Sequence, residues 1–223
     1  TCYMNSILQQ LFMIPTFRYA ILGTDDNESP KSSSITKYDP QDDNAFHQLQ
    51  VMYTFLTLSE QPYYNPQNFC RSYKDRNGNP INIRIQQDSQ EFYNDFCDKI
   101  EQHLKKTKYK YIINDIFTGK TCSSVVCDSC NHVSNRLEDF YCLSLEINNI
   151  NNLKDSLEKF IISEYIDDFK CDFCNDKVKI QIRTTLCKLP NTLVIHLKRF
   201  YMNYENNTTE KINSRFEFPI NIN

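Results

Sequence analysis

The sequence predicts an α+β fold, with helices in the first half and a sheet-rich second half. Up to about residue 108, apolar residues recur at steps of three and four, the spacing of a helix that is buried on one side. After Lys110 they alternate with polar residues, as in Leu143, Leu145 and Ile147, which is typical of half-buried antiparallel strands. With 223 residues, 40% of them hydrophobic and 24% charged, the chain can bury a substantial core.

Two helices are expected before residue 60. The first covers residues 1–22, with Thr1 as its cap and Pro15 interrupting or ending the helical turn. The segment 23–43 is rich in Asp, Ser, Asn and Pro and is interpreted as a surface loop. Apolar residues on one face then predict a helix over residues 43–59.

The most clearly marked helix begins after Asp88. A turn-rich stretch over residues 61–82 precedes it. Asp88 can cap the helix, and Glu91, three residues later, completes a pair that is similar to a capping box. One further short helix is expected among the strands, over residues 152–165, with these residues on one face: Leu153, Leu157, Phe160 and Ile161. Alternating residues predict further strands around Val178–Ile182 and Leu193–Leu197.

Charge and hydropathy argue against nucleic acid and membranes as partners. The formal net charge is -3, whereas nucleic-acid binding requires an excess of cations. One cluster of lysines, at residues 105, 106, 108 and 110, is interpreted as a solvated helix end. No apolar run approaches the length of a membrane span.

Two C-x2-C pairs, Cys127/Cys130 and Cys171/Cys174, stand forty residues apart. Four such thiolates can form a closed tetrahedral zinc site, so we expect a structural zinc ion. The metal would clamp the far end of a long, two-stranded excursion. Four metal-free thiols or two vicinal disulfides, as in a secreted protein, remain alternatives. His132 could replace one ligand, although a residue in such a place more often faces solvent.

Cys2 lies at the predicted start of the first helix, where the helix dipole and free N–H groups favour a thiolate. This position indicates a nucleophile. By position alone, however, a cysteine at a helix start is more often structural, so the neighbouring residues have to decide.

Those neighbouring residues carry a family resemblance. Residues 1–11, TCYMNSILQQL, resemble the cysteine box of the ubiquitin-specific proteases, a papain-like family. Residues 86–92, QQDSQEF, resemble the family's QQD-x-x-EF segment, and the paired cysteines resemble the zinc site of its fingers. The LKRF of residues 197–200 and the segment 212–219, ending FEFP, also match. The resemblance spans nearly the whole chain and points to the large fat-facets-type members.

The resemblance implies a papain-like fold with three parts: a helical thumb (1–108), zinc-binding fingers (109–190) and the start of a palm (191–223). It implies that Cys2 attacks the carbonyl of ubiquitin's C-terminal glycine and forms a thioester that water resolves. Gln87, Asp88 and Glu91 would line the channel for the ubiquitin tail, where carboxylates can meet its arginines. The implied partners are ubiquitin and ubiquitinated proteins, in the cytoplasm or nucleus.

The family's general-base histidine and its Asp or Asn follow the FxFP segment, and its oxyanion-hole Asn precedes the cysteine. None of the four histidines, His47, His103, His132 and His196, matches that motif. We therefore expect the chain to be a fragment that hydrolyses little by itself, although the intact parent is an active deubiquitinase. A non-catalytic, zinc-stabilised ubiquitin-binding module is the alternative. A zinc ribbon for DNA or RNA would need a basic face.

Overall fold

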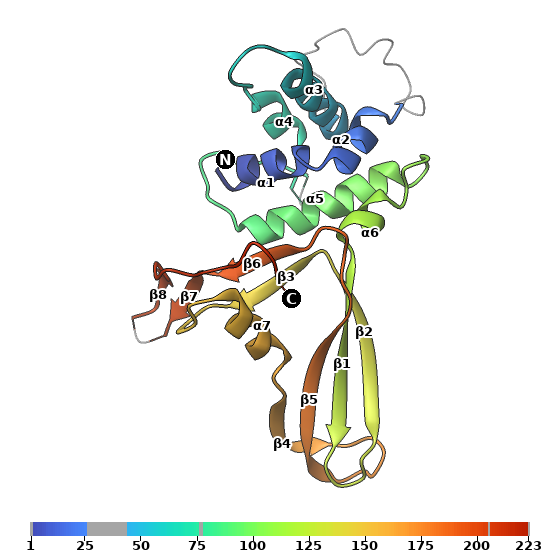
Figure 1. Cartoon of the computed structure of the whole chain (residues 1–223), viewed down its shortest axis with the longest axis vertical. Helices are drawn as coiled ribbons and strands as arrows, with labels where there is room; N and C mark the ends of the chain where they lie inside the picture. The colour runs from blue at the N-terminus through green and yellow to red at the C-terminus, as the bar shows by residue number, and fades with distance from the viewer. Residues whose placement is uncertain (1, 26–43, 76–77, 205, 223) are drawn as a thin grey trace. The chain divides into compact units, whose positions relative to one another are not determined.

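The computed structural model describes residues 2–25, 44–75, 78–204 and 206–222. It divides into a helical unit, Thr1–Ile116, and a sheet unit, Phe117–Asn223 (Figure 1). The expected division at residues 108 and 190 stays a prediction. No helix in the described ranges is both long and apolar enough to cross a membrane.

The described residues of the helical unit form six helices: α1 (Cys2–Phe12), α2 (Pro15–Leu22), α3 (Ala45–Leu58), α4 (Gln67–Ser72), α5 (Ser89–Leu104) and α6 (Ile112–Phe117), the last ending at the boundary. Pro15 is the first residue of α2, so the single helix expected over residues 1–22 is two helices. Thr1 and residues 26–43 of the predicted loop lie outside the described residues.

Aromatic packing joins these helices. α1 packs against α2 and α5, and α3 packs against α2 and α4. Tyr53 of α3 is fully buried, meets Phe12 and Phe17 edge-on, and donates a hydrogen bond of 3.3 Å to the Leu8 carbonyl. The buried face of α1, formed by Tyr3, Met4, Leu8 and Leu11, is thereby held in place with Cys2 at its start.

Three expectations for the helices were incomplete. Residues 61–82, expected as turns, contain α4, and the region after Lys110, expected as strands, begins with α6. Both helices have six residues, which is too short for a periodic pattern to be read. The helix expected over residues 152–165 is α7 (Leu153–Ile161); it ends early because a strand begins at Glu164, and Ile161 is exposed.

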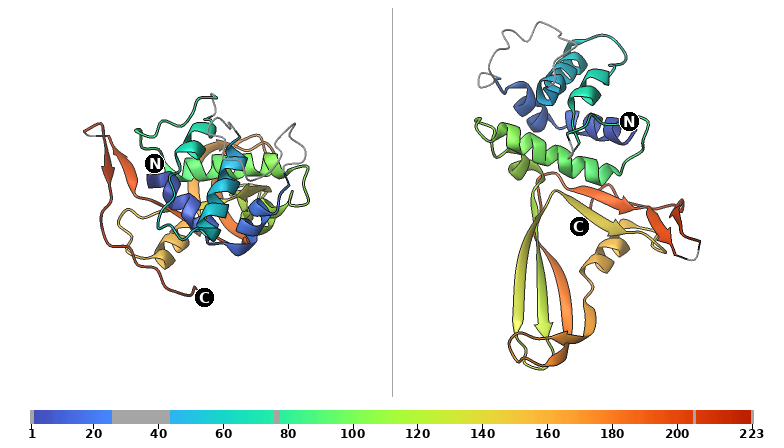
Figure 2. Two further views of the ribbon diagram at one scale, coloured as in Figure 1. Left: turned by 90° about the horizontal axis from the view of Figure 1, so that it is seen from above. Right: turned by 180° about the vertical axis from the view of Figure 1, so that it is seen from behind.

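The sheet unit contains β1 (Gly119–Cys127), β2 (Val133–Phe140), β3 (Cys142–Glu146), α7, β4 (Glu164–Lys170), β5 (Lys177–Lys188), β6 (Val194–Lys198), β7 (Phe200–Asn203) and β8 (Thr208–Lys211). An antiparallel sheet has the order β2-β1-β5-β4, and β7 pairs with β8. Figure 2 shows β1, β2 and β5 running side by side as a long excursion. The excursion is therefore four-stranded, not two-stranded, because β1 and β5 join two hairpins.

The pairing of β3 also corrects an expectation. β3 pairs with β6 in parallel, with Leu143 opposite Ile195 and Leu145 opposite Leu197, whereas the alternation favoured antiparallel pairing. Alternation reports one buried face, and both kinds of sheet provide one. The buried residues Leu143, Leu145 and Leu153 form a core between β3 and α7.

Candidate active site and metal centre

Cys2 is the first residue of α1 and its side chain is exposed. This position agrees with the predicted one. Its Sγ lies 3.9 Å from Nε2 of Gln86, on the segment that leads into α5. The sulfur therefore lies at the helix end whose first backbone N–H groups have no partner within the helix.

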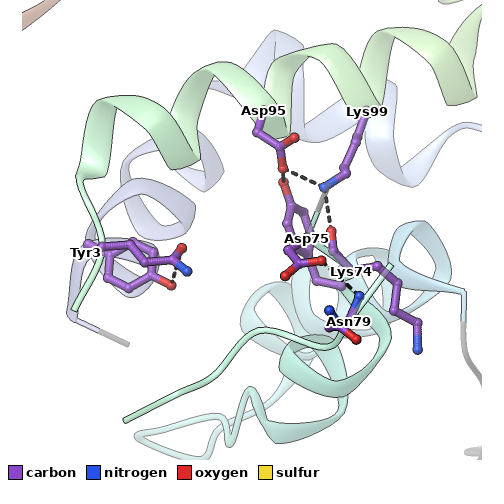
Figure 3. A network of polar contacts seen from close by, with 8 residues as sticks. Tyr3, Lys74, Asp75, Asn79, Asp95 and Lys99 are labelled. Atoms are coloured by element: carbon purple, nitrogen blue, oxygen red, sulfur yellow. Dashed lines mark hydrogen bonds and ion pairs between the residues drawn. The ribbon is translucent and has the colours of Figure 1, made fainter. Parts of the chain in front are cut away.

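A second contact fixes the start of α1 to the same segment. The Tyr3 hydroxyl donates a hydrogen bond of 3.1 Å to Oε1 of Gln87 (Figure 3). The Tyr3 side chain is almost completely buried, its ring meets Phe92 of α5 edge-on, and burial raises the pKa of its hydroxyl, which stays protonated and able to donate. Residues 2 and 3 thus contact residues 86 and 87 in turn. The predicted Gln87 therefore contacts the residue that follows the predicted Cys2, and its neighbour Gln86 contacts Cys2 itself.

Asp88 caps α5, as its sequence position predicts. Its Oδ1 accepts hydrogen bonds from the backbone N–H groups of Gln90, at 2.7 Å, and Glu91, at 3.2 Å. Both bonds use one oxygen, so Oδ2 takes no part in the cap. The carboxylate can therefore cap the helix and still meet a ligand.

Asp88 and Glu91 line a cleft of about 570 Å³ within the helical unit. The lining residues are Tyr73, Asp75, Ile81, Gln86, Gln87, Asp88, Glu91, Phe92 and Asp95. Four of these residues carry carboxylates and none is lysine or arginine, so the cleft is negatively charged. Its volume suits a small ligand or a short extended peptide. We call it the acidic cleft.

Besides Asp88, which caps α5, two of the four carboxylates have structural partners. Asp95 Oδ2 accepts a hydrogen bond of 2.7 Å from the Tyr73 hydroxyl and pairs with the ammonium group of Lys99, which also donates to the Lys74 carbonyl (Figure 3). Burial and the Asp95 carboxylate raise the Tyr73 pKa. Asp75 Oδ1 accepts from the Asn79 backbone. Sequence reasoning missed this network; the only signal was the i, i+4 spacing of Asp95 and Lys99.

The four paired cysteines meet at the end of the four-stranded sheet. Their sulfur atoms all lie within 4.8 Å of one another, and those of Cys130 and Cys171 are 3.9 Å apart. Tetrahedral zinc with Zn–S bonds of 2.3 Å would separate its sulfurs by about 3.8 Å. The donor set and its spacing therefore fit a metal ion that prefers thiolates.

The two pairs lie on nearly identical turns. Asn131 N–H donates to the Cys127 carbonyl and Asn175 N–H to the Cys171 carbonyl, each at 2.9 Å. Both asparagines have left-handed backbones, with φ of 56° and 60°, a conformation that Asn tolerates better than most residues. The sequence therefore builds two matching turns around one centre.

Hydrogen bonds shift the pKa values of these thiols in opposite directions. Backbone N–H groups of Cys174 and Phe173 lower the pKa of Cys171 to about 7. At Cys130 a backbone hydrogen bond at His132 acts in the same direction, but bonds with neighbouring thiols, first that of Cys127, raise the pKa to about 12. A bound metal would have to displace the protons that these thiols carry.

His132 does not complete the centre. Its ring stacks on Phe173, with centroids 4.8 Å apart and planes within 2°. The four sulfurs form a full tetrahedral set without it. Beneath the turns, Cys127, Cys171, Val178 and Ile180 are buried together as a small core.

Comparison with known proteins decides the family. Residues 1–223 match the family described as ubiquitin carboxyl-terminal hydrolase. The chain belongs to this family. The family predicted from the cysteine box and the QQD segment is thereby confirmed.

Relatives within the ubiquitin carboxyl-terminal hydrolase family are long proteins. Ubiquitin carboxyl-terminal hydrolase 9Y of Homo sapiens is 32% identical over 256 residues, which cover 98% of this chain and 10% of that protein. Hydrolase 24 of Mus musculus is 32% identical over 226 residues, covering 100% of this chain and 8% of the relative. The chain thus spans about a tenth or less of these curated relatives.

Solved structures agree with the fold. A chain of the SAGA Ubp8/Sgf11/Sus1/Sgf73 DUB module bound to ubiquitin aldehyde is 26% identical, with a TM-score of 0.75 over 98% of this chain and 49% of that chain. A chain from a second form of the module is 25% identical, with a TM-score of 0.72, and the match covers 98% of this chain and 50% of that chain. This chain spans about half of the solved chains that it matches, and the predicted fold of the ubiquitin-specific proteases is confirmed.

The four histidines of this hydrolase-family chain lie where the sequence places them. His47 lies in α3, and His103, in α5, stacks on Phe46 with ring centroids 3.9 Å apart. His132 follows the first cysteine turn. His196, in β6, has Nδ1 3.3 Å from the Ser144 hydroxyl. Among the described residues of the helical unit, the Cys2 sulfur contacts Gln86 and neither His47 nor His103.

Proposed function

We propose that this chain is the nucleophile-bearing part of a cysteine-type deubiquitinase. The observation that carries the proposal is the exposed Cys2 sulfur at a helix start, in contact with Gln86 at the edge of the acidic cleft. Family membership supports it, and one structural relative is a DUB module bound to ubiquitin aldehyde.

The reaction is acyl transfer from ubiquitin to water. The Cys2 thiolate attacks the carbonyl carbon of ubiquitin's C-terminal glycine, and the bond to the departing lysine amine breaks, leaving a thioester. Water then cleaves the thioester, which restores the thiol and releases the ubiquitin carboxylate. The leaving amine needs a proton that Cys2 gave up, so a general base has to carry it. Because none of the four histidines matches the family's general-base motif, we propose that the chain alone hydrolyses little.

The acidic cleft would bind the tail of ubiquitin before this step. Asp88 Oδ2 and the Glu91 carboxylate can accept charge-assisted hydrogen bonds from the tail's arginines. Gln87 accepts from Tyr3 through Oε1, which leaves its Nε2 amide as a donor for a peptide carbonyl. The substrates would be ubiquitinated proteins. The free thiols favour a reducing compartment, the cytoplasm or nucleus.

We further propose that the four paired cysteines hold one structural zinc ion. The ion would join the turn after β1 to the turn before β5, at the end of an excursion whose own core is small. Zinc would supply cross-linking there and no chemistry, because four protein thiolates leave no open position.

The test uses ubiquitin-AMC with this chain and with a longer protein that includes the segment after FEFP. The proposal expects turnover in the longer protein, abolished by Cys2→Ala, and little or none in the chain alone. Clear turnover by the chain, lost in Cys2→Ala, would show that one of its four histidines serves as the base. Failure of the longer, folded protein to release AMC would contradict the enzyme proposal.

A non-catalytic ubiquitin-binding module is the second candidate. One observation favours it: the acidic cleft and the cysteine centre are both formed by described residues, and neither needs a general base to bind a ligand. This candidate predicts that the longer protein binds ubiquitin equally well with and without Cys2→Ala and turns over no substrate.

A further inference from the structure

The two ends of α5 face clefts of opposite charge. The helix has 16 residues, so it is about 24 Å long. Asp88 and Glu91 mark the acidic cleft at its start. At its end a second cleft, of about 510 Å³, is lined by Gly23, Thr24, Asp25, Gln102, His103, Lys105, Lys106, Thr107, Lys108 and Tyr109. We call this the lysine cleft.

The lysine cleft concentrates positive charge in an acidic chain. Lys105, Lys106 and Lys108 contribute three ammonium groups and Asp25 a single carboxylate, although the chain as a whole carries -3. All three lysines are exposed. Among the described residues, none of the three forms an ion pair.

Lysines near the end of a helix often serve only to neutralise its last carbonyls, but here other groups do so. At the end of α5, the Leu104 carbonyl accepts from the N–H and the hydroxyl of Thr107, at 2.8 and 2.9 Å. At the end of α2, the buried Gln50 amide donates 2.9 Å bonds to the carbonyls of Ile21 and Thr24. These three carbonyls are therefore satisfied by groups other than the lysines.

The walls of the lysine cleft are held in a defined geometry. Thr107 Oγ1 accepts from the Tyr109 N–H at 3.1 Å, which fixes the turn that carries the lysines. Tyr109 then packs against the end of α2, where a Cβ on Gly23 would come within 2.6 Å of its hydroxyl. Gly23 thus permits the contact that joins the two walls. Specific contacts within the helical unit therefore hold both walls of the cleft in place.

We propose that the lysine cleft binds a small ligand that carries at least two phosphate groups. Lysine recognises phosphate as a point charge, and three ammonium groups around one cleft match a multiply charged anion. The volume lies in the range of small-molecule sites. The site is separate from the acidic cleft, about a helix length away, so a ligand there leaves the tail-binding residues uncovered.

Inorganic tripolyphosphate is a suitable probe, titrated calorimetrically into the chain at constant ionic strength. Exposed charge pairs are worth up to about 1 kcal/mol each, so Lys105→Gln, Lys106→Gln and Lys108→Gln should each weaken binding roughly two- to fivefold. Lys110→Gln is the matched control, because Lys110 belongs to the same run of lysines but does not line the cleft. It should leave binding unchanged.

A second comparison tests the ligand class. Polyglutamate of equal charge should bind more weakly than tripolyphosphate. Absence of tripolyphosphate binding, equal loss in Lys110→Gln and Lys106→Gln, or polyglutamate binding as tight as tripolyphosphate would each overturn the proposal. The first outcome would show that the cleft does not hold a polyphosphate, the second would indicate only diffuse attraction to the lysines, and the third an acidic peptide as the ligand. The Lys→Gln variants should keep wild-type unfolding temperatures, since the three side chains are exposed.

Discussion

Asp88 is expected to have two roles that substitutions can separate. It caps α5 through Oδ1 and, in the proposed function, meets the arginines of the ubiquitin tail through its negative charge. Asp88→Ala removes both roles. Asp88→Asn keeps an oxygen that can accept from Gln90 and Glu91 but removes the charge, because asparagine and aspartate are about equal as N-caps.

The magnitudes differ enough to be measured. Loss of the cap in Asp88→Ala should lower the free energy of unfolding by about 1 kcal/mol, or roughly 4 °C in a unit of this size. Asp88→Asn should unfold within about 0.5 kcal/mol of the unmodified chain. Loss of a charge-assisted hydrogen bond, worth about 1.5–3 kcal/mol, should weaken ubiquitin binding roughly 10- to 150-fold in both variants.

Thermal unfolding followed by circular dichroism, together with titration of fluorescent ubiquitin, measures the two effects on the same samples. Asn44→Ala is the matched control, because Asn44 caps α3 through the N–H groups of Phe46 and His47 and does not line the acidic cleft. It should lose stability and keep ubiquitin affinity. If Asp88→Asn were as unstable as Asp88→Ala, the cap assignment would be wrong; if both Asp88 variants bound ubiquitin normally, the tail contact would be wrong.

Three further predictions concern the cysteine centre, Tyr3 and pH. Metal analysis should find one zinc per chain, and Cys171→Ser should lower both the zinc content and the unfolding temperature. Cys187 is exposed and lies outside the centre, so Cys187→Ser should change neither. A metal-free chain of full stability would contradict the assignment of a structural zinc site. Tyr3→Phe should destabilise the helical unit by about 1 kcal/mol, because Gln87 loses its hydrogen-bond donor while the packing on Phe92 remains. Urea unfolding measures this change, and an unchanged midpoint would show that the hydrogen bond contributes nothing to stability. Zinc affinity, measured by competition with a chelator, should fall as the pH drops from about 8 to about 6, because Cys130, with a pKa of about 12, has to lose a proton to bind the metal throughout, and below about 7 Cys171 has to lose one too. An affinity that does not change over this range would contradict the assignment.

The local features of the fold were predictable because they depend on neighbouring residues. Asp88 marks the start of α5, Pro15 lies where α2 begins after α1, and the two C-x2-C pairs predict matching turns. The parallel pairing of β3 with β6 was not predictable, because residues 142–146 meet a strand about fifty residues later and alternation is the same in either direction. α4 and α6 are too short to leave a periodic pattern.

The candidate site divides in the same way. Cys2, Gln87, Asp88 and Glu91 were identified from contiguous motifs, and the structure brings Cys2 and Gln86 into contact. The network of Tyr73, Asp95 and Lys99 depends on a segment before α5 folding back on that helix, and no local pattern encodes such a contact. The lysines at residues 105–108 were visible in the sequence, but the cleft is formed only by the approach of α2 to the end of α5.

The most direct test of a nucleophilic Cys2 beside the acidic cleft is labelling with ubiquitin that carries an electrophile at its C-terminus, followed by mass spectrometry of the adduct. This reaction needs the thiolate and the tail-binding cleft but no general base for a leaving amine. The predicted result is one ubiquitin attached at Cys2, lost in Cys2→Ala and slowed in Asp88→Asn. An adduct on Cys187, the other exposed cysteine, or labelling indifferent to Asp88→Asn, would contradict it.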